Sequence, residues 1–240
     1  MTETAAVDET SPALVLAIDT SLSAVSACVS HVGEPAPIAF EAMAMARGHA
    51  EALVPLIDRV VSQIDGGFAA LTRVAVTIGP GSFTGIRVGV AAARAIGLAC
   101  KIPVVGVSTL SALAAPAIAS GFRPTIVAAI DAHHGNVYVQ SFSVDGGTQL
   151  GATILSVKEA IRAVGQGPIR LVGSGATMLA IEAWSLGINA EIDEKSMTPD
   201  IAFVARLGLL ADPVRALPRP FYIRPPDAKP QTNGVIARVE

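Results

Sequence analysis

The chain has 240 residues and a mass of 24.4 kDa, a length that fits one compact body or two domains of about 110 residues each. Hydrophobic residues make up 51% of the sequence and charged residues 15%, with a mean hydropathy of +0.55, which excludes a wholly disordered chain. The 17 basic and 20 acidic residues give a formal charge of −3. The chain therefore lacks the general positive field of proteins that bind nucleic acid unaided.

Two cysteines, Cys28 and Cys100, lie far apart and belong to no Cys-X-X-Cys or histidine pattern. This spacing excludes a disulfide framework and a zinc knuckle, and reduced thiols indicate the cytoplasm. Residues 1–12 are acidic and lack the basic segment of a signal peptide, so we predict a disordered tail. The uncharged stretch Ile102–Phe122 is interrupted by prolines and glycines. It predicts a strand and a short helix, and no membrane span.

A strand, a polar turn and a second strand occur twice in the sequence. The first copy is predicted at Leu14–Asp19 and Ala24–Val29, joined by Asp19-Thr20-Ser21, and the second at Thr125–Ile130 and Val137–Val144, joined through Asp131. The repeat is one of pattern and not of residue identity. It predicts an α/β protein built from two similar halves.

Helices and further strands are predicted between and after these hairpins. Apolar residues at helical spacing define a helix over Gly48–Asp65, with a kink at Pro55 unless the helix starts there. The elements predicted next are a strand at Val74–Ile78, a helix from Ser82 or Thr84 to Cys100, a strand at Pro103–Val107 and a helix from Ser108. After the second hairpin, the prediction is a helix at Ser156–Val164, a strand at Ile169–Val172 and a helix from Thr177. The last helix is capped by Thr198 or Pro199 and ends at Leu210, and an extended segment begins at Leu217.

The loop Gly79–Gly85 combines a glycine-rich turn with the start of a helix, an arrangement that binds phosphate in other proteins. It lacks the lysine of a P-loop and the flanking glycines of a nucleophile elbow. Two interpretations stay open. The loop is either a βα turn that lets strand and helix pack closely, or an anion site.

The helix after this loop carries a stripe of small residues at four-residue spacing: Gly85, Gly89, Ala93 and Gly97. Each glycine costs a helix about 1 kcal/mol relative to alanine, so a close neighbour must offset the stripe. That neighbour is either this chain's own sheet or another subunit. Basic residues recur at every seventh position on or just beyond this helix, and acidic residues recur at every seventh position on the preceding helix. The two rows of charge are either solvent-exposed faces or contacts that align the helices of two chains at an interface. They are Arg87, Arg94 and Lys101, and Glu51, Asp58 and Asp65.

The four histidines form no metal-binding pattern, since neither a His-Glu-X-X-His motif nor a pair four residues apart is present. Asp19 and Asp131, each at a hairpin turn, are better candidates for function. Such turns hold a metal-bound water or phosphate in two-lobed ATPases, although each aspartate also fits a simple Asx turn. No metal site and no catalytic residue is predicted.

Three segments closely resemble the TsaB (YeaZ) family in order and spacing: Leu16–Ser21 (LAIDTS), Gly48–Ile57 (GHAEALVPLI) and Gly79–Gly89 (GPGSFTGIRVG). The likeness extends over nearly the whole chain through Pro103–Leu110, Ile130–Ala132, Phe221–Arg224 and Ala228–Lys229. The chain departs from the family at His133 and His134, where arginine is usual. Because histidine is mostly neutral at pH 7, this change weakens the hypothesis that the turn binds phosphate.

The resemblance implies an actin-like ATPase (ribonuclease H-like) fold of two related lobes. It also implies a non-catalytic subunit that activates a paralogous TsaD-type transferase, which installs threonylcarbamoyl on the adenosine next to the anticodon of tRNAs reading ANN codons. The implied partners are this transferase, a TsaE-type small ATPase, a second copy of the chain when it is alone, and tRNA through the complex only. The expected divisions are a tail at 1–12, an N-terminal lobe at 13–107, a C-terminal lobe at 108–216 and a proline-rich extension at 217–240.

The family's interfaces use the first two helices, so the resemblance favours an interface over internal packing for the stripes described above. The predicted interface residues are His49, Glu51, Leu53, Leu56, Ile57, Val60, Gly85, Arg87, Gly89, Ala93, Arg94 and Gly97. The candidate nucleotide or anion site comprises Asp19, Thr20, Ser21, Gly79, Gly81, Ser82 and Asp131. No cofactor is expected, apart from a nucleotide that the subunit interface could hold. The alternative function is a nucleotide-binding phosphotransferase or ATPase of the actin-like superfamily, in which Asp19, Gly79–Ser82 and Gly173–Ala176 surround ATP.

Overall fold

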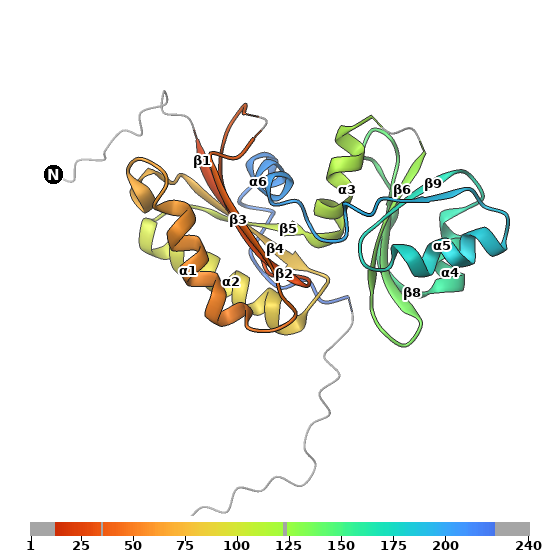
Figure 1. The fold of residues 1–240 in the computed structure, drawn as a ribbon. Helices are drawn as coiled ribbons and strands as arrows, with labels where there is room; N and C mark the ends of the chain where they lie inside the picture. Colours follow the sequence, from red (N-terminus) through yellow and green to blue (C-terminus); the bar gives the residue numbers. More distant parts are fainter. Residues whose placement is uncertain (1–12, 35, 122–123, 224–240) are drawn as a thin grey trace, which may run out of the picture.

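The structure is a computed structural model that describes residues 13–34, 36–121 and 124–223. The predicted tail 1–12 and most of the predicted extension 217–240 lie outside the described residues. Figure 1 shows two lobes side by side, each built on one five-stranded sheet.

The two sheets have the same topology. The first has the order β3-β2-β1-β4-β5 and the second β8-β7-β6-β9-β10, so β6 takes the place of β1. In each sheet the first three strands are antiparallel and the last three parallel. The first sheet contains β1 (Leu14–Asp19), β2 (Ala24–His31), β3 (Ala39–Ala44), β4 (Arg73–Gly79) and β5 (Val104–Ser108); the second contains β6 (Thr125–Asp131), β7 (Asn136–Phe142), β8 (Thr148–Ser156), β9 (Ile169–Val172) and β10 (Ala190–Ile192). The predicted duplication is confirmed.

Helices cover both faces of each sheet, and two of them are exchanged between the lobes. On the first sheet, α1 (His49–Val61) and α2 (Phe83–Cys100) cover one face. The other face is covered by α6 (Ile201–Leu210), which follows the last strand of the second sheet. On the second sheet, α4 (Val157–Val164) and α5 (Ala176–Ser185) cover one face and α3 (Thr109–Ala119) the other. The packing thus places α6 with the N-terminal lobe, although its sequence falls in the predicted segment 108–216.

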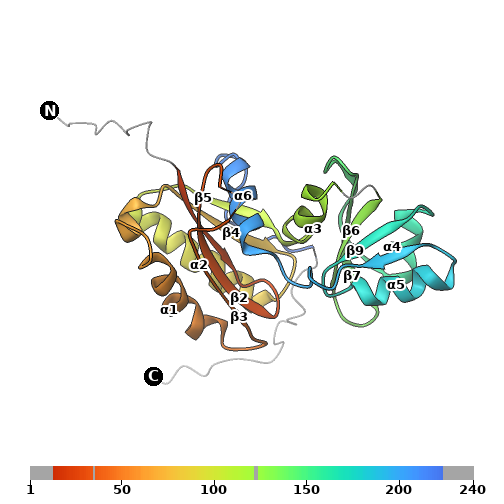
Figure 2. The same cartoon turned by 45° about the horizontal axis from the view of Figure 1, so that its top comes forward.

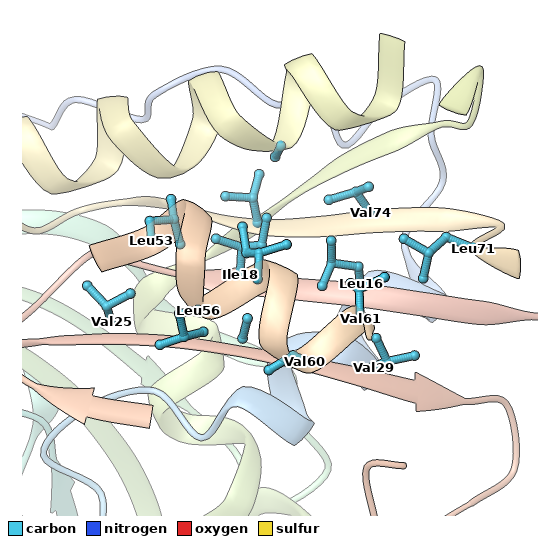
Figure 3. Close-up of a cluster of buried hydrophobic side chains, with 14 of the residues drawn as sticks. Leu16, Ile18, Val25, Val29, Leu53, Leu56, Val60, Val61, Leu71 and Val74 are labelled. Carbon is cyan, nitrogen blue, oxygen red and sulfur yellow. The ribbon is translucent and has the colours of Figure 1, made fainter. Parts of the chain in front are cut away.

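The predicted apolar stripe of α1 forms the centre of the first core. Figure 3 shows Leu53, Leu56 and Val60 in one cluster with Leu16 and Ile18 of β1 and with Val25 and Val29 of β2, and all seven side chains are fully buried. At about 25 cal/mol per Å² of apolar surface removed from water, each large side chain contributes about 1.5–3 kcal/mol. Pro55 lies inside the helix on its exposed side, so the helix does not begin there.

The glycine stripe of α2 packs against this chain's own first lobe. A Cβ atom at Gly85 would collide with the Thr20 carbonyl oxygen, and one at Gly89 with the Thr20 hydroxyl. The same construction at Gly97 meets the side chain of Val104. Of the two neighbours left open by the sequence, the sheet is therefore the one that the stripe contacts. By length and composition α2 is also apolar enough to cross a membrane, a test that core helices of globular domains pass as well.

Three strands were not predicted from the sequence: β3, β8 and β10. β3 is rich in alanine, with methionine and glutamate, residues that favour helices, and β10 has three residues only. The cap of α6 was also predicted wrongly. It is Asp200, whose carboxylate accepts the Ala202 N–H at 2.9 Å, in place of Thr198 or Pro199.

We expect Gly85→Ala to lower the free energy of unfolding by about 1–3 kcal/mol, although alanine is normally the better helix former. The reason is that the new methyl group meets a backbone carbonyl, which cannot rotate away. Urea denaturation measures the change. The matched control is Ala91→Gly on the exposed face of the same helix, for which helix propensity alone predicts a loss of about 1 kcal/mol. A Gly85→Ala protein as stable as the parent would contradict the close packing.

Candidate functional site

A cleft of about 690 Å³ lies between the two lobes, at the carboxyl ends of β1, β4 and β6. Figure 2 shows the lobes meeting in this region. Polar atoms come from both halves of the duplication, and aromatic side chains come from the end of the described chain. The lining includes Ser21, Ser23, His49, Gly81, Ser82 and Phe83 from the first lobe, Asp131, His133, Tyr138 and Ser174 from the second, and Phe221, Tyr222 and Ile223. The structure therefore brings together Ser21, Gly81, Ser82 and Asp131 of the predicted site.

Asp19 does not line the cleft, because its carboxyl group is buried behind the β1–β2 turn. Its Oδ1 atom accepts hydrogen bonds from the Ser21 N–H at 3.0 Å, the Ser21 hydroxyl at 2.6 Å and the Thr77 hydroxyl at 2.6 Å. The Oδ2 atom has no partner among the described residues. Asp19 is 0% exposed, and burial raises its pKa above the ordinary value, an effect that the hydrogen bonds of Ser21 and Thr77 oppose. In this conformation the Asp19 carboxyl group stabilises the β1–β2 turn through these hydrogen bonds and does not reach a ligand in the cleft.

Asp131 occupies the equivalent position in the second half and makes the same local bond. Its Oδ1 accepts the His133 N–H at 2.8 Å, as Asp19 accepts the N–H two residues later. Its side chain is 38% exposed and lines the cleft, so it remains accessible to a ligand. His133 and His134 form the turn with left-handed backbone angles, φ 61° and 54°. The His133 Nδ1 atom lies 3.7 Å from Asp131 Oδ2.

The Gly-Pro-Gly loop packs onto the β1–β2 turn. The Ser82 N–H donates to the Ser21 carbonyl at 2.7 Å, and the Ser82 hydroxyl caps α2 by accepting the Gly85 N–H at 3.2 Å. A Cβ at Gly81 would collide with the same Ser21 carbonyl. These contacts support the interpretation of the loop as a close-packing βα turn. They also occupy two of the polar groups that a phosphate would need.

Thr20 links the turn to α2, since its hydroxyl donates to the Gly85 carbonyl at 2.7 Å. His49 links the turn to α1, since its Nε2 donates to the Leu22 carbonyl at 3.0 Å. Of the described lining residues, His49 and His133 are the ones that can carry a positive charge. In residues 13–34, 36–121 and 124–223, no group of three or more histidine, cysteine, aspartate or glutamate side chains is placed to hold a metal ion.

Most of the predicted interface residues face the interior of the chain, which corrects their assignment. Leu53, Leu56, Ile57 and Val60 belong to the core under α1, and Gly85, Gly89, Ala93 and Gly97 are buried under α2. His49 is buried at the turn. The helical periods were identified correctly, but these faces belong to this chain's own sheet and are not available to a partner. Only Glu51, Arg87 and Arg94 of the predicted set are exposed.

The exposed sides of α1 and α2 form a different surface, which we call the docking face. Its apolar residues include Val54, 64% exposed, and Leu98, 83% exposed. Its acidic residues lie on α1 and its basic residues on α2, apart from the exposed Arg59 of α1, which pairs with Glu41 of β3 at 2.6 Å. The docking face comprises Glu51, Val54, Pro55 and Asp58 of α1 and Arg87, Ala91, Arg94, Ala95 and Leu98 of α2. Within the described part of the chain, no ion pair joins these acidic and basic residues.

A family model described as TsaD, tRNA N6-adenosine threonylcarbamoyltransferase, matches residues 43–195, more than half of the chain. The tRNA threonylcarbamoyladenosine biosynthesis protein TsaB of Haemophilus influenzae is 36% identical over 124 residues, 52% of this chain and 51% of that one. TsaB of Escherichia coli is 32% identical over 131 residues, 55% of each. The chain belongs to the TsaB (YeaZ) family. Its alignment spans about half the length of these two curated relatives.

A Mycobacterium tuberculosis relative, described as an uncharacterized protein, is 32% identical over 216 residues, 90% of this chain and 94% of that one. Two solved structures have the same fold. One, from Pseudomonas aeruginosa and described as similar to peptidase YeaZ, gives a TM-score of 0.71 at 23% identity and covers 88% of this chain and 100% of that one. YeaZ from Pseudomonas aeruginosa gives 0.65 at 22% identity, over 88% and 99%. The predicted two-lobed, actin-like ATPase fold is confirmed.

Several lining residues were missed by the sequence-based site. Ser174, which follows β9 as Ser82 follows β4, was predicted only for the alternative function, as part of Gly173–Ala176. Phe221 and Tyr222 belong to a motif that carried the family resemblance, but their position in the cleft has no signature in local sequence. Asp19 and Thr20, predicted with the site, lie beneath it.

We expect the pH dependence of stability to identify Asp19 as a buried carboxyl group with a raised pKa. Its pKa is raised in the folded chain, so above the unfolded value of about 3.9 the unfolded chain releases a proton that the folded chain retains. The free energy of unfolding therefore falls as pH rises from that value to the folded pKa. Asp19→Asn should remove this fall, as measured by urea denaturation from pH 4 to pH 7. Asp131→Asn, which removes the exposed equivalent, is the control, and an unchanged pH profile in Asp19→Asn would contradict the assignment.

Proposed function

We propose that this chain is a non-catalytic subunit in the synthesis of threonylcarbamoyladenosine on tRNA and that it activates a TsaD-type transferase. The modified base is the adenosine next to the anticodon of tRNAs that read ANN codons. The observation that carries the proposal is membership of the TsaB (YeaZ) family, whose curated members in Haemophilus influenzae and Escherichia coli are named for this biosynthesis.

The condition of the cleft supports a non-catalytic role. Asp19 is sealed behind the turn and its Oδ1 is occupied by three donors. The polar groups of Ser82 are engaged within the first lobe. Among the described lining residues there is no lysine or arginine. Such a cleft offers little positive charge to balance a triphosphate.

The docking face supports a partner role. It combines exposed apolar side chains, Val54 in the first half of α1 and Leu98 near the end of α2, with acidic residues on α1 and basic residues on α2. In a two-fold pair, α1 of one chain lies beside α2 of the other, and each acidic row then faces a basic row. The surface is self-complementary in this sense. We infer that it forms a homodimer when the chain is alone, and that the transferase paralogue replaces the second copy.

The remaining partners follow from the same proposal. A TsaE-type small ATPase completes the complex, and tRNA is bound through the complex, consistent with a formal charge of −3 on this chain. The two free cysteines are consistent with the cytoplasm.

The alternative function, a nucleotide-binding phosphotransferase or ATPase, draws support from one observation. The N-termini of α2 and α5 both open into the cleft beside the accessible carboxylate of Asp131. Helix N-termini favour anions. The engaged loop and the sealed Asp19 weigh against this function.

Reconstitution tests the proposal directly. Threonylcarbamoyladenosine is measured on a cognate tRNA with donor synthase, transferase and small ATPase, with and without this chain. We expect product only when this chain is present, and none from this chain with donor and tRNA when the transferase is left out. Equal yield without this chain would overturn the proposal. ATP hydrolysis by the isolated chain with magnesium would favour the alternative.

Leu98→Asp tests the docking face. A leucine buried on pairing contributes about 1.5–3 kcal/mol, so we expect the dissociation constants of the homodimer and of the transferase complex to rise about 10- to 100-fold. Analytical ultracentrifugation and calorimetry measure them. Leu210→Asp is the matched control, since Leu210 lies at the end of α6 and is 85% exposed, against 83% for Leu98. Equal effects of the two substitutions would contradict the position of the face.

A further inference from the structure

After α6 the chain runs back along the first lobe, and Phe221, Tyr222 and Ile223, the last described residues, line the cleft. We call residues 217–223 the C-terminal strap. Figure 1 shows this blue segment running past the first sheet to the space between the lobes. Just before the strap, the Ala216 carbonyl accepts the Gly106 N–H of β5 at 2.8 Å. Near its end, the Phe221 N–H donates to the Ile78 carbonyl of β4 at 2.7 Å.

Glycines in β4 and β5 leave room for the backbone of this strap. A Cβ at Gly106 would lie 2.8 Å from the Leu217 carbonyl oxygen, and one at Gly79 would lie 2.9 Å from the Phe221 carbonyl oxygen. The β4–β5 register shifts between Thr77 and Gly79, so the carbonyl of Ile78 is turned to the strap at the irregularity. The strap is therefore an integral part of the lobe and not a loosely attached end.

The strap reaches the first turns of α2 through Tyr222. The Tyr222 and Phe83 rings lie 5.3 Å apart. The guanidinium carbon of Arg87 sits 3.7 Å above the Phe83 ring, and Arg87 Nε donates to the Tyr222 hydroxyl at 2.9 Å. Arg87 is thus held on one face by a cation–π contact and at one edge by a hydrogen bond.

Arg87 is also the first basic residue of the docking face. The contacts above use Nε and one face of the guanidinium, and neither Nη atom has a hydrogen-bond partner among the described residues. Two Nη donors in a fixed plane suit a carboxylate, which is the group that the acidic row of a partner presents.

We propose that Tyr222 is a positioning residue for pairing with a second copy of this chain: the strap fixes Arg87 so that its free Nη donors meet Glu51 or Asp58 on α1 of that copy. This inference rests on the proposed function. It adds that Tyr222 and Phe83 hold the Arg87 side chain in place before the chain binds its partner. An unrestrained arginine loses side-chain freedom on binding, whereas one already held by Phe83 and Tyr222 loses less. The strap thus strengthens pairing without itself contacting the partner.

A double-mutant cycle on the full chain tests this role. Tyr222→Phe keeps the ring and removes the hydroxyl that holds Arg87. We expect it to raise the homodimer and transferase dissociation constants about three- to tenfold, and to have no effect in an Arg87→Ala background. Arg87→Lys is a second variant, which keeps the charge but removes the Nη donors themselves, so its loss should be at least as large as that of Tyr222→Phe. Thermal melting confirms that each variant is folded.

Two truncations provide the matched control. A chain ending at Ile223 keeps the strap's contacts and should pair like the full chain, whereas one ending at Pro220 should pair as weakly as Tyr222→Phe. Equal losses from Tyr222→Phe with and without Arg87, or no loss at all while the parent pairs, would overturn the inference alone. Failure of the parent chain to pair with itself or the transferase would overturn the docking face, and this inference with it.

Discussion

The close approach of α2 to the β1–β2 turn is the contact on which the rest of the structure depends. Thr20 donates to the first turn of α2, Ser82 at its cap donates to Ser21, and Thr77 of β4 donates to Asp19. Glycines at positions 81, 85 and 89 leave no atoms in the way. Directional polar bonds therefore fix the helix on the sheet, in addition to apolar packing, and a helix fixed in this way offers its outer face in one orientation.

The same aspartate-containing turn occurs in both halves, but the aspartate is buried in one and exposed in the other because different loops pack against it. Asp19 and Asp131 each accept the N–H two residues later. In the first half the Gly-Pro-Gly loop closes over the turn and the carboxyl is buried. In the second half the loop of the same length, residues 173–175, packs differently: the Gly175 N–H donates to the Ala129 carbonyl, the Ser174 hydroxyl accepts the Asp131 N–H, and Asp131 stays at the cleft. A duplicated pattern in sequence thus predicts the shared backbone geometry, whereas accessibility depends on the loop packed above it.

The sequence alone predicts correctly those elements that have a clear hydrophobic periodicity or a clear turn motif. The apolar stripe of α1, the βα unit around Gly79 and both hairpins all have local signatures, and each was found. β3 and β8 were missed because their side chains are partly exposed and do not alternate clearly. The exchange of α3 and α6 was missed because nothing local in an apolar helix says which of two sheets it covers. The cleft was predicted only in part for the same reason: Tyr222 lies 139 residues after Phe83 in the chain, yet their rings meet there.

The interface residues illustrate a more general ambiguity in reading small-residue stripes. A stripe such as Gly85, Gly89 and Gly97 indicates that something approaches the helix closely, but its spacing does not identify the neighbour. Topology does, because a helix that connects two parallel strands must pack on their sheet. The close-approach face of α2 was therefore committed to β1, β4 and β5 before any partner is considered. The opposite face of α2 is exposed, and there Arg87 and Arg94 alternate with Ala91, Ala95 and Leu98, which is why the proposed pairing uses that face.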